Sequence, residues 1–124
     1  MIFLDTHVVV WLYAGCVAKL SKPAIEQIEN NELFVSQLVR LELQYLFEIG
    51  RITVEPEILL KNLKQSIGLK ISQVKVEQVF DQAIHCEWTR DVFDRLITAE
   101  AEASNVVLVT KDEKIRTHYD KACW

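Results

Sequence analysis

The sequence predicts an α/β fold in which helices cover both faces of a parallel sheet. Short, fully apolar segments at residues 2–4, 33–35 and 106–109 have the length and composition of buried strands. Each of them is followed by polar residues and then by a segment whose apolar side chains recur with helical spacing. Strands that are buried on both faces and alternate with helices are typical of parallel sheets.

The boundaries of the helices are marked by residues that favour helix ends. Ser21 and Ser36 are typical N-caps, because a serine hydroxyl accepts a hydrogen bond from the first helical turn. Gly50 and Gly68 favour termination, because glycine readily adopts the left-handed conformation that closes a helix. These signals predict strands over residues 2–4, 33–35, 69–71 and 106–109, and helices over 6–13, 21–30, 36–49, 55–67, 72–86, 91–104 and 112–119.

Length and composition restrict the class of protein. The 124 residues suit a single domain over 1–124, and the 50% hydrophobic content is sufficient for a core. No segment approaches the roughly 20 apolar residues that cross a bilayer, so no membrane association is expected. The three cysteines are far apart and odd in number, which argues against a disulfide framework and favours a cytoplasmic protein.

The charge balance excludes a generally basic nucleic-acid coat. The chain has 14 basic and 18 acidic side chains and a net charge of −4. Setting four acids aside leaves 14 of each sign, so four acids could account for the whole excess. A protein of this kind that handles a phosphate backbone needs local basic residues and bound cations to offset its own acids.

Two aspartates follow predicted strands directly and should lie at the same edge of the sheet. Asp5 comes after residues 2–4, and Asp112 stands three residues past Val109. In open α/β sheets, ligands bind beyond the carboxyl ends of the strands. Each aspartate taken alone is also explained by helix N-capping, since aspartate is a favoured N-cap.

Glu42 is harder to explain structurally. Its helix carries a polar stripe at Gln37, Arg40, Gln44, Glu48 and Arg51. At about 100° per residue, Glu42 lies on the opposite, apolar face. A carboxylate there costs several kcal/mol unless it is protonated, paired or bound to a metal. A buried ion pair and a half-exposed position at the helix rim are the alternative explanations.

Asp91 and Asp94 open the next predicted helix. Asp91 is the better N-cap, and Asp94 then occupies the third helical position, on a polar stripe with Arg95 and Thr98. Several carboxylates at one edge repel each other, and Mg²⁺ or Mn²⁺ relieves this because hard cations prefer oxygen ligands. Such ions activate water against phosphodiesters. We therefore expect a metal site formed by Asp5, Glu42, Asp94 and Asp112, with Asp91 as an additional candidate.

Four segments resemble, in the right order, motifs of the PIN-domain family. They are FLDTHVVVWL, VSQLVRLEL, TRDVFDRLITAEA and VVLVTKD, and the match is to the VapC branch, the ribonuclease toxins of toxin–antitoxin pairs. The resemblance extends over nearly the whole chain. It implies a three-layer α/β/α sandwich with a central parallel sheet, and an acid-rich groove that binds Mg²⁺ or Mn²⁺. It places the family's four acids on Asp5, Glu42, Asp94 and Asp112.

The resemblance also implies supporting residues and partners. Ser36 opens the S-x5-E helix, Thr6 supplies a hydroxyl beside the first acid, and Thr110 begins a T-R-D motif in which Lys111 replaces the arginine. Val92 stands where the family often has proline, which changes only a helix-start preference. The expected partners are an RNA substrate and a VapB-like antitoxin that covers the groove, and homodimers or larger complexes with antitoxin are expected. Candidates for phosphate contacts are Arg90, Arg95, Lys111 and Arg116, with Arg40 a weaker one because it lies opposite Glu42.

Other functions have less support. His7, His85 and His118 lack metal-ligand spacing and are expected to have surface or packing roles. No glycine-rich phosphate loop or serine-nucleophile motif is present. The leading hypothesis is thus a Mg²⁺- or Mn²⁺-dependent endoribonuclease. The alternatives are a catalytically silent PIN-like module that binds RNA or protein, and a metal-dependent phosphatase acting on small molecules.

Overall fold

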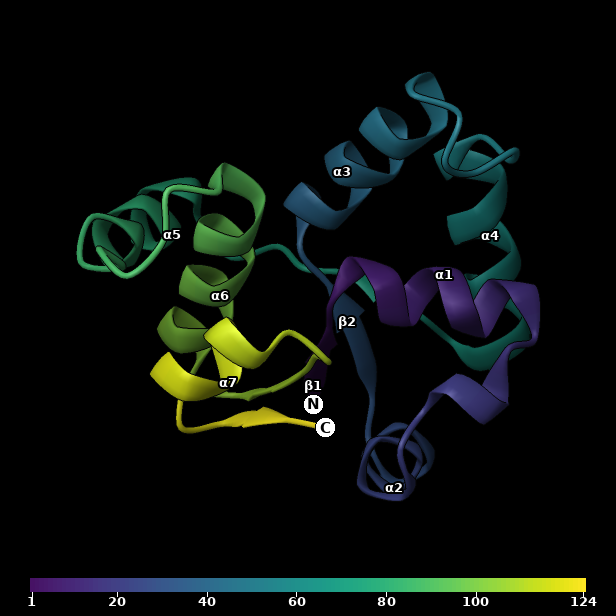
Figure 1. Cartoon of the computed structure of the whole chain (residues 1–124), viewed down its shortest axis with the longest axis horizontal. Coiled ribbons are helices and arrows are strands. Elements are labelled where there is room, and N and C mark those ends of the chain that lie inside the picture. Colours follow the sequence, from purple (N-terminus) through teal and green to yellow (C-terminus); the bar gives the residue numbers. More distant parts are fainter.

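A parallel sheet of five short strands forms the centre of the molecule. The computed structural model describes residues 1–124, and the strand order is β3-β2-β1-β4-β5 (Figure 1). Every neighbouring pair is parallel, as the apolar segments predicted. The strands are β1 (Ile2–Leu4), β2 (Leu33–Val35), β3 (Lys70–Ile71), β4 (Val107–Val109) and β5 (Ala122–Cys123).

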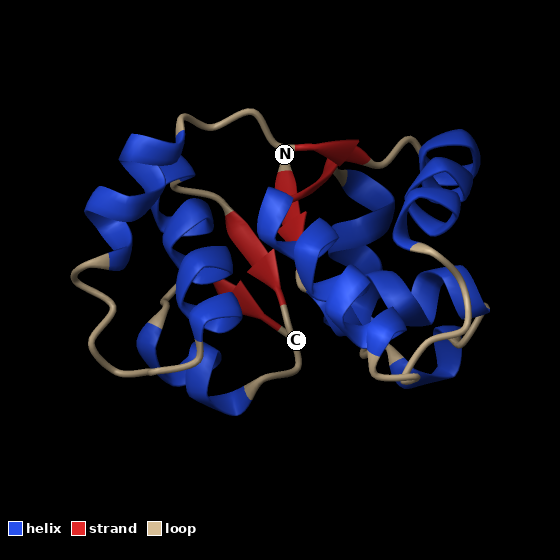
Figure 2. Ribbon diagram, turned by 90° about the horizontal axis from the view of Figure 1, so that it is seen from above, coloured by secondary structure: helices blue, strands red, loops and turns tan.

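Helices form a layer on each side of the sheet. Helices α1–α4 lie on one side of the strands and α5–α7 on the other (Figures 1 and 2). Right-handed crossovers require this, because the chain moves from β1 to β3 in one direction across the sheet and then reverses to β4 and β5. The helices are α1 (Thr6–Ala14), α2 (Lys22–Asn30), α3 (Gln37–Glu48), α4 (Pro56–Ile67), α5 (Val76–Ala83), α6 (Val92–Ser104) and α7 (Glu113–His118), with a 3₁₀ turn η1 (Val17–Lys19). None of them combines the length and the apolar character needed to span a membrane.

The core is continuous through the sheet. All three residues of β1 are buried, because side chains on both of its faces meet a helical layer. The largest cluster of buried side chains joins β1 to Val8 and Val9 of α1 and to Ile97 and Ala101 of α6. Burying a large apolar side chain contributes about 1.5–3 kcal/mol, so this central strand is held firmly in place.

The polar edge of the sheet has a topological switch point between β1 and β4. These strands are neighbours, but α1 and α7, which follow them, lie on opposite sides of the sheet. Crevices that bind ligands form at such points. Leu4 pairs with Val109 in register, so the next residues along each strand, Asp5 and Thr110, lie side by side.

The helix predicted over residues 72–86 is too long, and one strand of the sheet was not predicted. Helix α5 begins at Val76 rather than residue 72, because Ser72 donates its backbone N–H to the carbonyl of Val35 (2.8 Å) and continues the extended path of β3. The Ser72 hydroxyl then accepts a bond from the Val74 N–H (3.3 Å), which turns the chain. Strand β5 was not predicted, since two residues carry no detectable periodicity.

Candidate active site

The four acids expected from the sequence line one groove at the carboxyl edge of the sheet. They come from four separate places: the end of β1, the middle of α3, the first turn of α6 and the start of α7. The groove has a volume of about 550 Å³. It is lined by Asp5, Thr6, His7, Val10, Trp11, Lys19, Glu42, Leu46, Arg51, Ile52, Asp94 and Asp112.

Asp5 is held rigidly at the base of this groove. It is only 3% exposed, and it is the N-cap of α1. Its Oδ1 accepts a bond from the Thr6 backbone N–H (2.7 Å), and its Oδ2 accepts one from the Thr110 hydroxyl (2.6 Å). The capping role considered for Asp5 is therefore real. A carboxylate has about four acceptor sites, so two bonds leave capacity for a further ligand.

Asp112 is linked to Asp5 through Thr110. The Thr110 hydroxyl donates to Asp5 and accepts from the backbone N–H of Asp112 (3.1 Å). Asp112 caps α7 by accepting a bond from the Ile115 N–H at Oδ1 (2.9 Å). Its other carboxylate oxygen accepts no hydrogen bond within the protein. Capping thus orients this aspartate without using the whole carboxylate.

Glu42 contacts the first helix from across the groove. Ser36 begins α3 as expected, its hydroxyl accepting a bond from the Leu38 N–H (3.0 Å). One turn and a half later, the Glu42 Oε1 accepts a hydrogen bond from the Thr6 hydroxyl. Burial raises the pKa of Glu42 above its usual range; the Thr6 bond opposes this, and the nearby Asp5 charge adds to it. Glu42 is half-buried, so it occupies the rim position considered for it.

The apolar face expected around Glu42 is only partly buried. Val39 and Leu43 are fully buried, and Leu46 is half-buried. Tyr45, three residues after Glu42 on the same helix, is 49% exposed and contacts the ring of Phe93. Burial is the main cost of placing a carboxylate here, and the charges of Asp5 and Asp91 add a smaller one.

Asp94 lines the groove, and Asp91 does not. Asp91 is exposed and caps α6, its Oδ1 accepting a bond from the Asp94 N–H (2.9 Å). Burial and, in decreasing order, the negative charges of Asp91, Asp5, Asp112 and Glu42 together raise the pKa of Asp94 to about 7. The groove therefore concentrates enough negative charge to keep one of its acids partly protonated at neutral pH.

The helix that carries Asp94 differs from the sequence expectation on one point. Thr98 was placed on a polar stripe, but it is fully buried and its hydroxyl has no hydrogen-bond partner. Residues 96–101 of α6 are all buried, because α3 and α5 both pack against this helix. Periodicity cannot identify such a helix as amphipathic.

The donor atoms of the groove suit a hard divalent cation. They are carboxylate oxygens supported by the hydroxyls of Thr6 and Thr110, and such oxygens are what Mg²⁺ and Mn²⁺ prefer. No three His, Cys, Asp or Glu side chains converge tightly enough to form a closed cage. This arrangement still fits Mg²⁺, which usually keeps several waters and takes only one or two protein carboxylates directly.

Arg95 and Arg40, both candidates for phosphate contacts, have partners within the chain. The Arg95 guanidinium donates three hydrogen bonds, at 2.8–3.3 Å, to backbone carbonyls within residues 83–89, so its nitrogens are already engaged in closing the end of α5. Arg40 points away from the groove and pairs with Glu57 (2.6 Å) on the exposed side of α3. Neither arginine is free to contact a phosphate in the groove.

Different basic residues border the acids. Arg90 and Arg116 each donate to a nearby backbone carbonyl and do not line the groove. Lys111 places its ammonium near the ring of Trp11, at the groove edge. Lys19 and Arg51 also line the groove. Sequence analysis did not single out Lys19, which ends the 3₁₀ turn η1, and it placed Arg51 on the polar stripe opposite Glu42. Arg51 lies beyond the end of α3, where the helical periodicity no longer gives the direction of a side chain.

Two ring side chains of α1 were also missed. His7 was assigned a surface or packing role, but it lines the groove, and its Nε2 accepts a bond from the Lys111 backbone N–H (3.0 Å). Its Nδ1 lies 3.6 Å from the Oδ2 of Asp5. Trp11 lies one helical turn further along. The i to i+4 spacing of His7 and Trp11 was the signal that could have placed both beside Asp5.

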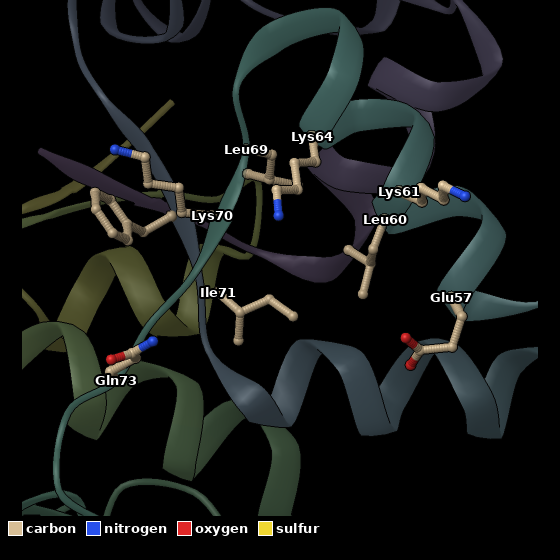
Figure 3. Close-up of a pocket in the computed structure, with 9 residues that line it drawn as sticks. Glu57, Leu60, Lys61, Lys64, Leu69, Lys70, Ile71 and Gln73 are labelled. Carbon is tan, nitrogen blue, oxygen red and sulfur yellow. The ribbon is translucent and has the colours of Figure 1, made fainter.

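A larger hollow lies elsewhere and contains none of these acids. It has a volume of about 750 Å³ and lies between α4 and the edge strand β3 (Figure 3). Lys61, Lys64 and Lys70 border it, together with Leu60 and Ile71. Size alone would select this hollow, but its lining offers no group of carboxylates for hydrolytic chemistry.

Comparisons with known proteins agree on one family. A model of the PIN domain matches residues 2–121. The ribonuclease VapC22 of Mycobacterium tuberculosis is 33% identical over 123 residues, covering 94% of this chain and 91% of the relative. Two solved structures share the fold. VapBC2 from Rickettsia felis, bound to a DNA fragment from the promoter of its genes, aligns with a TM-score of 0.62 at 22% identity, covering 94% of this chain and 92% of that one. A toxin–antitoxin complex from Klebsiella pneumoniae aligns with a TM-score of 0.63 at 12% identity, covering 100% of this chain and 97% of that one.

Proposed function

Because the chain belongs to the PIN domain family, we propose that it is a divalent-metal-dependent endoribonuclease, the toxin of a VapBC-type toxin–antitoxin pair. The observation that carries this proposal is the meeting of Asp5, Glu42, Asp94 and Asp112 in one groove. The 33% identity to a ribonuclease over nearly the whole chain supports the reaction type.

We infer that these four acids hold Mg²⁺ or Mn²⁺. A bound ion would supply Lewis-acid stabilisation of the phosphodiester and activation of a water. The protein's own contribution is orientation. The Thr110 hydroxyl bonds the carboxylate of Asp5 and the backbone N–H of Asp112, and the Thr6 hydroxyl bonds the carboxylate of Glu42, so the protein itself positions three of the four acids.

The proposed partner is a VapB-like antitoxin. Both structural neighbours are toxin–antitoxin complexes, and an acid-rich open groove is a surface that an antitoxin has to cover in order to block RNA. Self-association into homodimers is part of the same proposal. The three cysteines are free, which supports the cytoplasmic location expected from the sequence.

Cleavage assays with purified protein test the proposed reaction. We expect RNA cleavage to stop in EDTA, to return with Mg²⁺ or Mn²⁺, and to fall sharply in Asp5→Asn and Asp94→Asn. Asp120→Asn is the matched control, because Asp120 is exposed and lies outside the groove. Unchanged cleavage by folded Asp94→Asn, or in EDTA, would contradict the proposal.

The antitoxin is tested by co-purification from the native host, and the recovered protein should suppress cleavage when added back.

A further inference from the structure

Three aromatic rings form a contiguous cluster at the edge of the acid groove. The ring centroid of Trp11 lies 5.0 Å from that of His7 and 5.7 Å from that of Trp124, and His7 and Trp124 are 6.4 Å apart. The planes are tilted by 55–69° rather than stacked. Trp11 and Trp124 are half-buried, so both rings keep part of their surface open to solvent. We call these three residues the aromatic platform.

Two lysines approach the central ring of the platform. The Lys19 ammonium is 5.6 Å from the Trp11 centroid, and that of Lys111 is 5.8 Å from it. Neither ammonium is within ion-pair distance of a carboxylate, although the groove beside them is rich in acids. Cation–π contacts at exposed sites are weak, about 0.5–1 kcal/mol, so both lysines can be drawn away by a phosphate group.

The platform is directly connected to the acids. His7 accepts a bond from the backbone N–H of Lys111 and lies 3.6 Å from Asp5. Trp11 and Lys19 line the same groove as Asp5. A nucleotide that contacts the platform therefore lies in the same groove as the carboxylates.

Core packing accounts for only part of this arrangement, because Trp11 and Trp124 pack against the hydrophobic core and yet remain half-buried. Trp88, the remaining tryptophan, also packs against the core, but its ring is stacked on His118 at 5.0 Å and 7° and does not line the groove. At the platform the rings are tilted, a groove borders them, and two unpaired ammonium groups surround Trp11. Aromatic faces beside positive charge are the features by which proteins bind unpaired nucleotides.

We propose that the aromatic platform binds one unpaired nucleotide of the RNA, with its base stacked on Trp11 and its phosphates contacted by Lys19 and Lys111. This inference rests on the proposed ribonuclease function and adds a binding subsite to it. A base inside a duplex has no free face, so the subsite selects single-stranded or looped RNA. Stacking tolerates any base, so the subsite contributes affinity and strand selectivity more than sequence specificity.

Binding measurements with a short oligonucleotide test the subsite. The probe is a single-stranded 2′-O-methyl RNA hexamer in Mg²⁺, verified as intact by electrophoresis after each titration, and a matching hexamer of abasic residues. We expect Trp11→Leu to weaken binding of the intact hexamer about tenfold or more. Trp88→Leu, the matched control, should leave the affinity unchanged. Binding of the intact hexamer should quench the tryptophan fluorescence of the Trp88→Phe variant and should not quench that of the Trp11→Leu variant.

The abasic hexamer separates stacking from a general loss of structure. Wild type and Trp11→Leu should bind it equally, because no base is available to stack. An equal loss of affinity for both hexamers, or no loss for either, would overturn the proposal. Lys19→Ala should lower the slope of log affinity against log salt by about 0.7, the value for one phosphate of a single strand, while Lys64→Ala, on α4, should not.

These results are distinguishable from a failure of the proposed function. If wild type cleaves RNA and Trp11→Leu both binds and cleaves like wild type, the subsite is wrong and the ribonuclease stands. If wild type cuts no RNA but base-dependent binding through Trp11 persists, the subsite stands and the reaction is wrong.

Discussion

Replacing Asp94 with asparagine should stabilise the metal-free protein at pH 8 and should stabilise it less than half as much at pH 5. The substitution removes one negative charge from a groove that holds Asp5, Glu42 and Asp112, and it keeps the size of the side chain. Asp94 caps no helix with its carboxylate, so no hydrogen bond to the backbone is lost.

The variant should be the more stable protein because the pKa of Asp94 is raised in the folded state. Burial and the neighbouring charges raise the pKa of Asp94 to about 7 from an ordinary value of 3.8. Between these two values the folded protein binds more protons than the unfolded chain, so its stability falls as the pH rises from about 4 to about 7. Asparagine does not ionise, so the variant does not lose this stability.

The size of the effect is about 1–2 kcal/mol. The difference between 3.8 and about 7 corresponds at most to about 4 kcal/mol, and screening through the open groove reduces this severalfold. A carboxylate in the first turn of a helix also interacts favourably with the helix dipole, by about 0.3–1 kcal/mol, and asparagine forfeits that contribution. For a chain of this length, the melting temperature should rise by about 3–8 °C at pH 8.

Thermal unfolding in EDTA at pH 5 and pH 8 measures this directly. Glu77→Gln is the matched control, because Glu77 occupies the first turn of α5 on the exposed surface and reports the helix-dipole loss alone. Adding Mg²⁺ at pH 8 should stabilise wild type and should stabilise Asp94→Asn much less. A melting temperature that falls equally at both pH values would refute the reasoning, because it would show that Asp94 is not under electrostatic strain.

Two further substitutions separate positioning from phosphate binding. Thr110→Val should lower the free energy of unfolding in urea by about 1–3 kcal/mol, because it removes the only hydroxyl that donates to the Oδ2 of Asp5. Thr110→Ser keeps the hydroxyl and should be nearly as stable as the wild type. Equal stabilities of the valine and serine variants would contradict this. Arg95→Ala should cost about 2–3 kcal/mol by freeing three carbonyls at the end of α5, without changing the Mg²⁺-induced stabilisation. If Arg95→Ala instead impairs RNA binding at unchanged stability, the arginine is a phosphate contact after all.

The sequence predicts the elements wherever local chemistry determines them. Ser21, Ser36 and Asp91 were expected as N-caps and accept the corresponding backbone bonds, and Gly68 ends α4 with a left-handed conformation. The predictions fail where contacts between residues far apart in the sequence determine the secondary structure. The chain at Ser72 is extended because it bonds to β2, and β5 exists because it pairs with β4. Such pairings leave no trace in a short window of sequence.

The same division applies to the groove. The four acids were predictable because each stands at a strand end, at a helix start or on the wrong face of a helix. Lys19 and Arg51 were not, since nothing in their own neighbourhoods indicates that they face the acids. The backbone contacts of Arg95 could not be predicted for a related reason. A basic residue in a suggestive motif looks free to bind phosphate until the fold shows which carbonyls it already contacts.

Helix capping and metal binding are compatible explanations for the aspartates, although sequence reasoning set them against each other. Asp112 gives one oxygen to its helix and keeps the other free, and Asp5 accepts one donor at each oxygen. An N-cap holds its carboxylate at the N-terminus of a helix, where the free backbone N–H groups favour negative charge. That field partly offsets the mutual repulsion of the acids. Asp94, whose own carboxylate caps nothing, is the acid whose pKa rises to about 7. We therefore expect Asp94 to be the acid that releases a proton when a cation binds.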